Sequence, residues 1–398
     1  MLDKIKIENF TVFDEVEFQF GHGINIIIGD NGTGKSHLLK LAYAVSTVAS
    51  DSSKLESSPA KADLQKQIAT KLVNVFRPDS LGRLVRSKRA KGEGRGNRGR
   101  ATIQLHFVGD KEDWDFNFSG MAEKEVSMAS VPKTFPKSEA IYIPTKEVMS
   151  MFPGFASLYR NRELAMDETY FDLCLALDGA PLRGPRLEAI KQLLDPMEER
   201  LGGTVVRDGD RFYLDSDKGK TEMPLVAEGV RKLATLAHLL RNGALTKKGI
   251  VFWDEPESNL NPRLIRDVAA MLMNLASQGV QVFIGTHSFF LMKEIDMLKR
   301  MEKSLSQVPC RFITLGHDAD GEPVFEQGNR LQEISHIVYL RSGRRGNTTM
   351  TRMPATHSSK ITSKRLPVYR QSTLLHMTKR LTPYCSLSAR IFAATTVR

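Results

Sequence analysis

The eight residues GDNGTGKS at positions 29 to 36 have the types and the spacing needed to hold phosphate. They fit the pattern G-x-x-x-x-G-K-[ST], whose glycines let the backbone curl until several N–H groups point at phosphate oxygens. Lys35 would reach the β and γ phosphates of ATP, and the Ser36 hydroxyl would ligate Mg²⁺. A glycine turn without a ligand is the alternative. The predicted cofactor-binding residues are Gly29, Asp30, Asn31, Gly32, Thr33, Gly34, Lys35 and Ser36.

Two acids follow a short apolar run in the segment IVFWDE, positions 250 to 255. Four apolar residues before two carboxylates predict a buried strand that presents its acids at its carboxyl end, where ligands bind in parallel sheets. Asp254 is suited to a Mg²⁺ role, direct or through a water molecule. Glu255 is suited to polarising a water for in-line attack on the γ-phosphate. The alternative is a capped strand end without chemistry.

The histidine of Gly285-Thr286-His287-Ser288 follows the next apolar run along the chain. A single histidine is more often structural than catalytic. His287, however, ends the strand that we expect beside the Asp254 strand, where its imidazole could donate a hydrogen bond to the γ-phosphate. We therefore take it, together with Glu255, as a candidate catalytic residue.

The elements that position these motifs alternate between strand and helix. A dense apolar run at 24–28 predicts a buried strand before the glycine-rich loop, and the apolar spacing in 37–49 predicts a helix after it. The alternating segments 5–10 and 16–20 predict two edge strands. Near-continuous Val, Ile and Phe strands between helices predict an α/β fold with a largely parallel sheet.

Other elements are predicted from local patterns. Asn261 and Pro262 are suited to the N-cap and first turn of a helix, and Gly243 is suited to the end of another. The remaining predictions are a hairpin over 101–120, a short buried strand before Pro144, helices over 145–200, a hairpin over 203–215, a helix through Met297, and strands over 310–316 and 323–328.

The 398-residue chain is 41% hydrophobic and 26% charged, which is ordinary for a soluble globular protein. No apolar run reaches the roughly 20 residues that cross a bilayer, and the N-terminus lacks the apolar stretch of a secretion signal. We therefore expect a cytoplasmic protein without a membrane partner. The spacing of Cys174, Cys310 and Cys385 suggests neither a disulfide framework nor a zinc site.

The net charge of +11 is distributed unevenly. Residues 335–398 hold twelve basic residues, eighteen Ser or Thr and no acid, which leaves the first 334 residues at a net charge of −1. This tail is either a solvated basic arm for nucleic acid or the product of a shifted reading frame. We favour the second, because its apolar residues show no pattern. The segment Arg83 to Arg100 holds eight basic residues and one acid, and its glycines predict a mobile loop.

The motifs GDNGTGKS, VFWDEPESNLNP and IGTHS, in this order, resemble the ATP-binding-cassette (ABC) ATPases. The resemblance is greatest to the soluble branch with the structural-maintenance-of-chromosomes (SMC), RecF and overcoming-lysogenization-defect (OLD) families, as Asn31 and the start KIKIENFTVF also indicate. It implies a P-loop NTPase, an ABC ATPase head with an antiparallel β subdomain and an inserted helical lobe. The implied parts are an N-terminal ATPase lobe at 1–144 with a basic insert at 83–100, a helical lobe at 145–245, a C-terminal ATPase lobe at 246–334, and the basic tail at 335–398.

The same resemblance implies roles at a subunit interface. In that family two subunits enclose two ATP molecules, each held between the phosphate loop of one subunit and the signature segment of the other. Glu228 and Gly229 stand at the signature position, with Glu228 where the family usually has a serine. His287 matches the switch histidine, and residues 257–260 match the loop that contacts the partner subunit. Residues 143–147 occupy the place of a glutamine loop but contain no glutamine.

The resemblance implies an ATPase that forms an ATP-dependent homodimer, and three functions are compatible with it. The first couples ATP hydrolysis to a process involving DNA or RNA, or to anti-phage defence with an effector protein. The second is a nucleotide-dependent switch that regulates a partner effector. The third, an ATPase subunit of a membrane transporter, is disfavoured by the degenerate signature and the missing glutamine loop. The segment 145–245 has no long heptad run, which excludes a chromosome-type coiled-coil arm.

Overall fold

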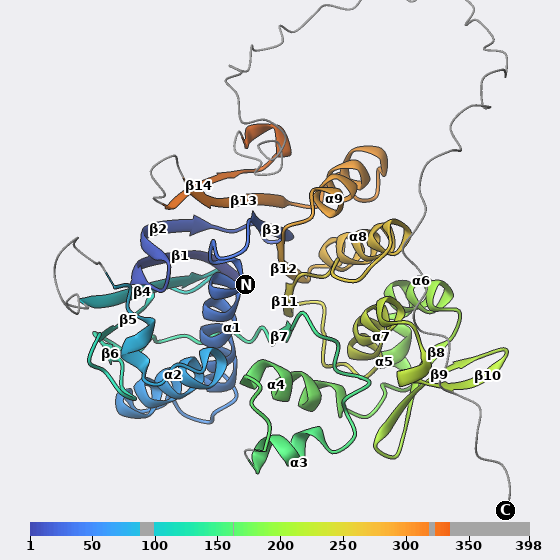
Figure 1. Ribbon diagram of the computed structural model, residues 1–398, viewed down its shortest axis with the longest axis horizontal. Coiled ribbons are helices and arrows are strands. Elements are labelled where there is room, and N and C mark those ends of the chain that lie inside the picture. Colours follow the sequence, from blue (N-terminus) through green and yellow to red (C-terminus); the bar gives the residue numbers. More distant parts are fainter. Residues whose placement is uncertain (88–98, 162, 318–322, 335–398) are drawn as a thin grey trace, which may run out of the picture. The chain divides into compact units, whose positions relative to one another are not determined.

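The computed structural model describes residues 1–87, 99–161, 163–317 and 323–334 (Figure 1). Its central sheet has the strand order β14-β13-β3-β12-β11-β7. Neighbouring strands from β13 to β7 are parallel, and β14 is antiparallel to β13. These strands are β3 Ile24–Gly29, β7 Ala140–Ile143, β11 Ile250–Asp254, β12 Gln281–Thr286, β13 Cys310–His317 and β14 Pro323–Gly328. The predicted α/β fold with a largely parallel sheet is confirmed.

A second, antiparallel sheet has the strand order β2-β1-β4-β5-β6. Its strands are β1 Leu2–Phe10, β2 Phe13–Gln19, β4 Arg100–Phe107, β5 Trp114–Ser119 and β6 Ser127–Met128. The hairpin predicted over 101–120 is confirmed as β4 and β5. The prediction of an edge strand at 5–10 is wrong, because β4 covers the second side of β1 and pairs Ile5 with Leu105.

The segment between the two halves of the central sheet is mainly helical. Its elements are α3 Phe155–Arg160, α4 Glu168–Leu177, α5 Pro185–Glu188, α6 Lys191–Leu201, β8 Thr204–Asp208, β9 Arg211–Ser216, β10 Gly219–Glu222, the 3₁₀ turn η2 Met223–Leu225, and α7 Glu228–Arg241. The hairpin predicted over 203–215 is confirmed as β8 and β9. Strand β10 extends it to a three-stranded sheet that the sequence analysis did not predict.

Helix α1, Lys35–Ser52, lies between the central and the antiparallel sheet (Figure 1). This position explains why α1 is buried on nearly every side rather than along one stripe. The two faces of the central sheet belong to two hydrophobic cores. On β3, Ile27 packs in the core that includes α1, while Ile26 and Ile28 pack in the core on the opposite face. The glycine-rich loop is therefore supported from both sides.

Helices α8, Pro262–Ser277, and α9, Phe289–Met301, follow β11 and β12 in the chain and contribute to that opposite core. The predicted start of α8 is confirmed, since the side chain of Asn261 accepts a hydrogen bond of 3.0 Å from the Leu264 N–H and Pro262 occupies the first turn. The predicted end of α7 is also confirmed. Gly243 has φ of 77° just beyond it, a left-handed conformation that favours glycine.

Helix α2, Lys61–Phe76, was not predicted, although its pattern is present in the sequence. Leu64, Ile68, Leu72 and Val75 are buried at helical spacing. A 3₁₀ turn, η1 Leu81–Leu84, follows it, and another, η3 Leu331–Glu333, ends the described chain. Most of the predicted basic loop, the whole of the predicted tail and Cys385 lie outside the described residues. Among the helices described, none has the length and apolar character to cross a membrane.

Candidate functional site

The glycine-rich loop connects the carboxyl end of β3 to the first turn of α1. Gly34, at φ of 103°, precedes the helix, and a Cβ on it would lie only 2.6 Å from Val12 and 2.7 Å from the ring of Phe13. A Cβ on Gly29 would lie 2.5 Å from the backbone oxygen of Leu315. Glycine is therefore required at both ends of the loop, which leads directly into the N-terminus of α1, where backbone N–H groups favour anions.

The ammonium group of Lys35 lies inside this loop. Its Nζ donates hydrogen bonds to the backbone oxygens of Gly29, at 2.8 Å, and Asp30, at 2.9 Å. Burial lowers the pKa of Lys35, while the negative charges of Glu255 and Asp254 oppose that shift. The ammonium of Lys35 is thus a buried cation that binds two backbone carbonyl oxygens and interacts with the charges of Asp254 and Glu255.

Asp254 is the last residue of β11 and is only 7% exposed. The Tyr142 hydroxyl donates to Asp254 Oδ2 at 3.3 Å, and Asp254 Oδ1 is a buried oxygen with no hydrogen-bond partner among the described residues. Burial raises the pKa of Asp254, and the nearby Ser36 hydroxyl opposes the shift. A buried, unsatisfied carboxylate oxygen next to a hydroxyl is the hard oxygen donor set that Mg²⁺ prefers, so Ser36 and Asp254 fit this ion.

Glu255 and His287 face each other across the ends of β11 and β12. His287 Nδ1 lies 3.3 Å from Glu255 Oε1. Glu255 has a left-handed φ of 49°, unusual for a residue with a side chain, and its N–H donates to the Gly285 oxygen at 2.8 Å. Strained backbone held by hydrogen bonds is a frequent feature of catalytic positions. The adjacency of these two strands, predicted from the sequence, is confirmed.

Glu257 lies within the protein rather than on its surface, at 6% exposure. Its Oε1 accepts hydrogen bonds from the Thr286 hydroxyl at 2.5 Å and from the His287 N–H at 3.2 Å. The family resemblance implied a partner-contacting loop that begins at this glutamate. In this chain the Glu257 side chain holds the backbone that carries His287, and the contact of residues 257–260 with a partner stays a prediction.

Glu228 and Gly229 form the first turn of α7. The side chain of Asn259 donates to Glu228 Oε1 at 3.0 Å, and a Cβ on Gly229 would lie 2.7 Å from both Leu260 and Leu264. Gly229 therefore allows α7 to pack closely against the start of α8. Among the described residues, no hydrogen bond or ion pair joins this turn to the glycine-rich loop of the same chain.

The sequence analysis missed the roles of three site residues, of which Gly285 was named only as part of the His287 motif. Tyr142 supports Asp254, and a Cβ on Gly285 would lie 3.1 Å from Asp254 Oδ1, so only glycine leaves that carboxylate its room. Lys232 of α7 is 2% exposed, and its Nζ contacts Ser258. Lys232 could have been recognised in the sequence, because it is a lysine on the helix face that otherwise carries buried apolar residues.

The segment 143–147, at the place of the glutamine loop, also contacts α7. Arg231 Nε lies 2.8 Å from Glu147 Oε1, and both side chains are largely buried. A glutamate in an ion pair with the signature-like helix therefore stands where the family pattern has its glutamine.

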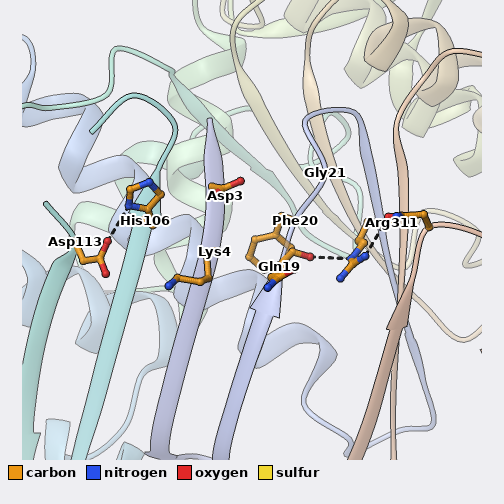
Figure 2. Close-up of a pocket in the computed structure, with 9 residues that line it drawn as sticks. Asp3, Lys4, Gln19, Phe20, Gly21, His106, Asp113 and Arg311 are labelled. Atoms are coloured by element: carbon orange, nitrogen blue, oxygen red, sulfur yellow. Dashed lines mark hydrogen bonds and ion pairs between the residues drawn. The ribbon is translucent and has the colours of Figure 1, made fainter. Parts of the chain in front are cut away.

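A hollow of about 670 Å³ lies at the opposite end of the central sheet (Figure 2). Gly21, in its wall, precedes β3, whereas the glycine-rich loop follows that strand. Two pairs of polar contacts lie in its wall: His106 Nδ1 lies 2.8 Å from Asp113 Oδ1, and Arg311 Nε donates to the Gln19 oxygen at 3.1 Å. None of the predicted site residues lines this hollow.

Two family models match the chain. An AAA-domain model matches residues 4–143, and an AAA-domain model whose description also names the AbiEii toxin and a type IV TA system matches residues 157–293. A search of the curated proteins finds no match.

Similar solved structures include an SMC head bound to the C-terminal winged-helix domain of ScpA, at 13% identity, TM-score 0.48, and coverage of 83% of this chain and 98% of that one. The SMC head domain from Thermotoga maritima has 13% identity, TM-score 0.44, and coverage of 82% and 98%. An ATP-binding cassette of an ABC transporter, MJ1267, has 12% identity, TM-score 0.37, and coverage of 84% and 93%.

Proposed function

We propose that the chain is a P-loop ATPase of the SMC/RecF-like branch that its motifs indicate, and that it binds ATP with Mg²⁺, hydrolyses it and dimerises around it. One observation carries this proposal. The strand order β3-β12-β11 brings Lys35, His287 and the acids Asp254 and Glu255 to the same carboxyl edge of the sheet.

Each residue has a defined part in the proposed reaction. The loop N–H groups and Lys35 bind the phosphates, and Ser36 and Asp254 hold the ion. Mg²⁺, when bound, neutralises charge on the phosphates. Glu255 orients the attacking water and accepts its proton, and His287 donates to the γ-phosphate. The contact between His287 and Glu255, at 3.3 Å, supports a joint action of the two side chains.

In the proposed dimer, Glu228 and Gly229 of one subunit face the nucleotide held by the other. ATP would then stabilise the closed dimer by contacts available only in that state. We assign the ATPase lobes to 1–144 and 246–334 and the helical lobe to 145–245. This division is supported by the central sheet, which takes β3 and β7 from the first part and β11 to β14 from the third.

A nucleotide-dependent switch is the second candidate, and Glu228 favours it. A carboxylate at the start of α7 would repel a partner's γ-phosphate, where a serine would donate a hydrogen bond. Slow hydrolysis would follow, while the phosphate loop alone would still hold ATP. Single-turnover ATP hydrolysis by the wild-type chain, with and without DNA, separates this switch from an ATPase that nucleic acid stimulates.

The coupled process is proposed to involve nucleic acid or anti-phage defence through an effector protein. The match of residues 157–293 to a family that is described with a type IV TA system supports a role in defence. The basic segment Arg83 to Arg100 supports a nucleic-acid contact by its charge, eight basic residues against one acid.

Replacement of Glu255 by Gln tests the proposed function. The amide keeps the shape of the side chain but cannot accept the water's proton, so we expect ATP hydrolysis to fall by about 10²- to 10³-fold. ATP binding should persist, and the variant should accumulate as a dimer in ATP, measured by light scattering. Glu302→Gln, an exposed acid beyond α9, is the control. A Glu255→Gln protein that hydrolyses ATP at the wild-type rate would refute the assignment.

A further inference from the structure

Two side chains on one face of α7 contact the turn that follows the acidic strand. Glu228 and Lys232 are four residues apart, so they lie one helical turn from each other. Glu228 accepts a hydrogen bond of 3.0 Å from Asn259, and Lys232 Nζ donates to the backbone oxygen of Ser258 at 2.7 Å. The first two turns of α7 are thus attached to the segment that begins with Glu255.

The contact between Lys232 and Ser258 extends to the backbone of Glu255. Lys232 Nζ also donates to Ser258 Oγ at 2.5 Å. A hydroxyl has a single hydrogen to donate, and here Ser258 Oγ donates it to the Glu255 oxygen at 3.0 Å. The lysine therefore fixes the direction of the serine hydroxyl, and that hydroxyl holds the carbonyl of Glu255.

Glu255 is a residue whose position needs such support. Its φ of 49° lies in the left-handed region, which is unfavourable for a residue with a side chain. A lysine buried to 2% exposure is also costly unless acceptors surround it. Burial lowers the pKa of Lys232, and the charges of Glu228, Glu257 and Glu255 oppose the shift. The ammonium is thus placed among the acids of the site.

We propose that Lys232 is a positioning residue that holds Glu255 in its hydrolytic orientation and couples that orientation to the placement of α7. The inference rests on the proposed ATP hydrolysis. Because α7 begins with the signature-like Glu228 and Gly229, a displacement of the helix reaches Glu255 through Lys232 and Ser258. Lys232 acts in this proposal through its contact with Ser258 and does not contact the nucleotide.

Steady-state hydrolysis and ATP affinity of the full chain test this proposal. Lys232→Met keeps the length of the side chain but removes the ammonium, and we expect kcat to fall about 10- to 100-fold, as expected for a misplaced catalytic group. The Kd for ATP should change less than about twofold, since the phosphate loop is untouched. Lys232→Arg, which keeps the charge and the donors, should retain more of kcat than Lys232→Met. Lys248→Met, an exposed lysine in the loop after α7, is the control.

A milder variant covers the case in which Lys232→Met does not fold. Ser258→Ala removes the hydroxyl but keeps the backbone acceptor of Lys232, and it should lower kcat several-fold with little change in Kd. The double variant should lose no more than Lys232→Met alone, because both side chains act through one contact.

The results that overturn the proposal are distinct from failure of the proposed function. If the wild-type chain hydrolyses ATP and both Lys232→Met and Ser258→Ala retain its kcat, Lys232 has no positioning role. Equal losses of ATP affinity and thermal stability, with kcat unchanged in the folded fraction, also overturn it. A wild-type chain that binds ATP without hydrolysing it refutes the proposed hydrolysis itself.

Discussion

Lys35 combines a positive charge with two contacts that hold the glycine-rich loop. Two of its three ammonium hydrogens contact the oxygens of Gly29 and Asp30, so the lysine shapes the loop as well as providing charge. Its location beside Asp254 and Glu255 keeps this cation within reach of both acids. A single substitution here therefore removes the proposed phosphate ligand and two contacts within the loop.

Replacement of Lys35 by Ala should weaken ATP binding about 10- to 100-fold, the loss expected when a charged hydrogen bond to phosphate is removed. Isothermal titration of the full chain with ATP and Mg²⁺ measures the effect. Lys54→Ala is a matched control, since Lys54 lies just beyond the C-terminal end of α1 and its side chain is 56% exposed. Equal ATP affinity of Lys35→Ala and wild type would show that the loop does not hold phosphate.

At the scale of elements, α7 connects the site to the helical segment. Its first turn contacts the loop after β11, and its later part carries His238, which is 1% exposed. His238 Nε2 lies 3.0 Å from the Leu177 oxygen, so this nitrogen carries the proton of a neutral ring. The ring packs edge-on against Phe212 at 4.8 Å. A charged imidazole at this position would have no water to stabilise its charge.

The stability of the protein should therefore fall in acid through His238. Burial lowers the pKa of His238 to about 4, below the 6.5 of a free histidine. Above pH 6.5 the ring is neutral in both states and contributes no pH dependence. Between pH 6.5 and 4 only the unfolded state binds the proton, so the free energy of unfolding falls as the pH falls, by about 3 kcal/mol in total.

Urea unfolding at pH 7.5, 6 and 5 measures this contribution. His238→Gln keeps an N–H donor for the Leu177 oxygen but does not titrate, so its stability should depend less on pH than that of wild type. His22→Gln, at a half-exposed position, should follow the wild-type profile. Parallel profiles for wild type and His238→Gln would exclude a buried neutral histidine.

At the scale of the whole described unit, the amide of Gln281 joins the two large sheets. Gln281 begins β12 with no exposed surface, and its Nε2 donates to the oxygens of Leu2, at 2.6 Å, and Gly21, at 2.9 Å. Its Oε1 accepts from the Leu2 N–H at 2.8 Å. One side chain thus satisfies three backbone groups between the antiparallel and the central sheet.

Replacement of Gln281 by Met should lower the free energy of unfolding by roughly 2–5 kcal/mol, because buried backbone groups of Leu2 and Gly21 lose their partners. Urea unfolding at neutral pH measures the loss. Gln67→Met, on the exposed face of α2, should stay within about 0.5 kcal/mol of wild type. A Gln281→Met protein as stable as wild type would mean that the amide is not needed to join the sheets.

The sequence by itself determined the parts whose physics is local. The glycine-rich octamer, the apolar strand before Asp254 and Glu255, and the strand before His287 each encode their own conformation within a few residues, and the α/β fold follows from their alternation. The helix over 61–76 was missed although its pattern was present, so that error lay in the interpretation rather than in the sequence.

Tertiary structure alone decided which side chains meet across long separations in the chain. Lys232 and Ser258 are 26 residues apart, and Gln281 and Leu2 are 279 apart. The inward position of Glu257 and the interior position of β1 likewise depend on how distant elements pack. A lysine in an amphipathic helix has the same local pattern whether its ammonium reaches solvent or a buried carbonyl. Only the packing of α7 against the loop after β11 distinguishes the two, and it makes Lys232 part of the site.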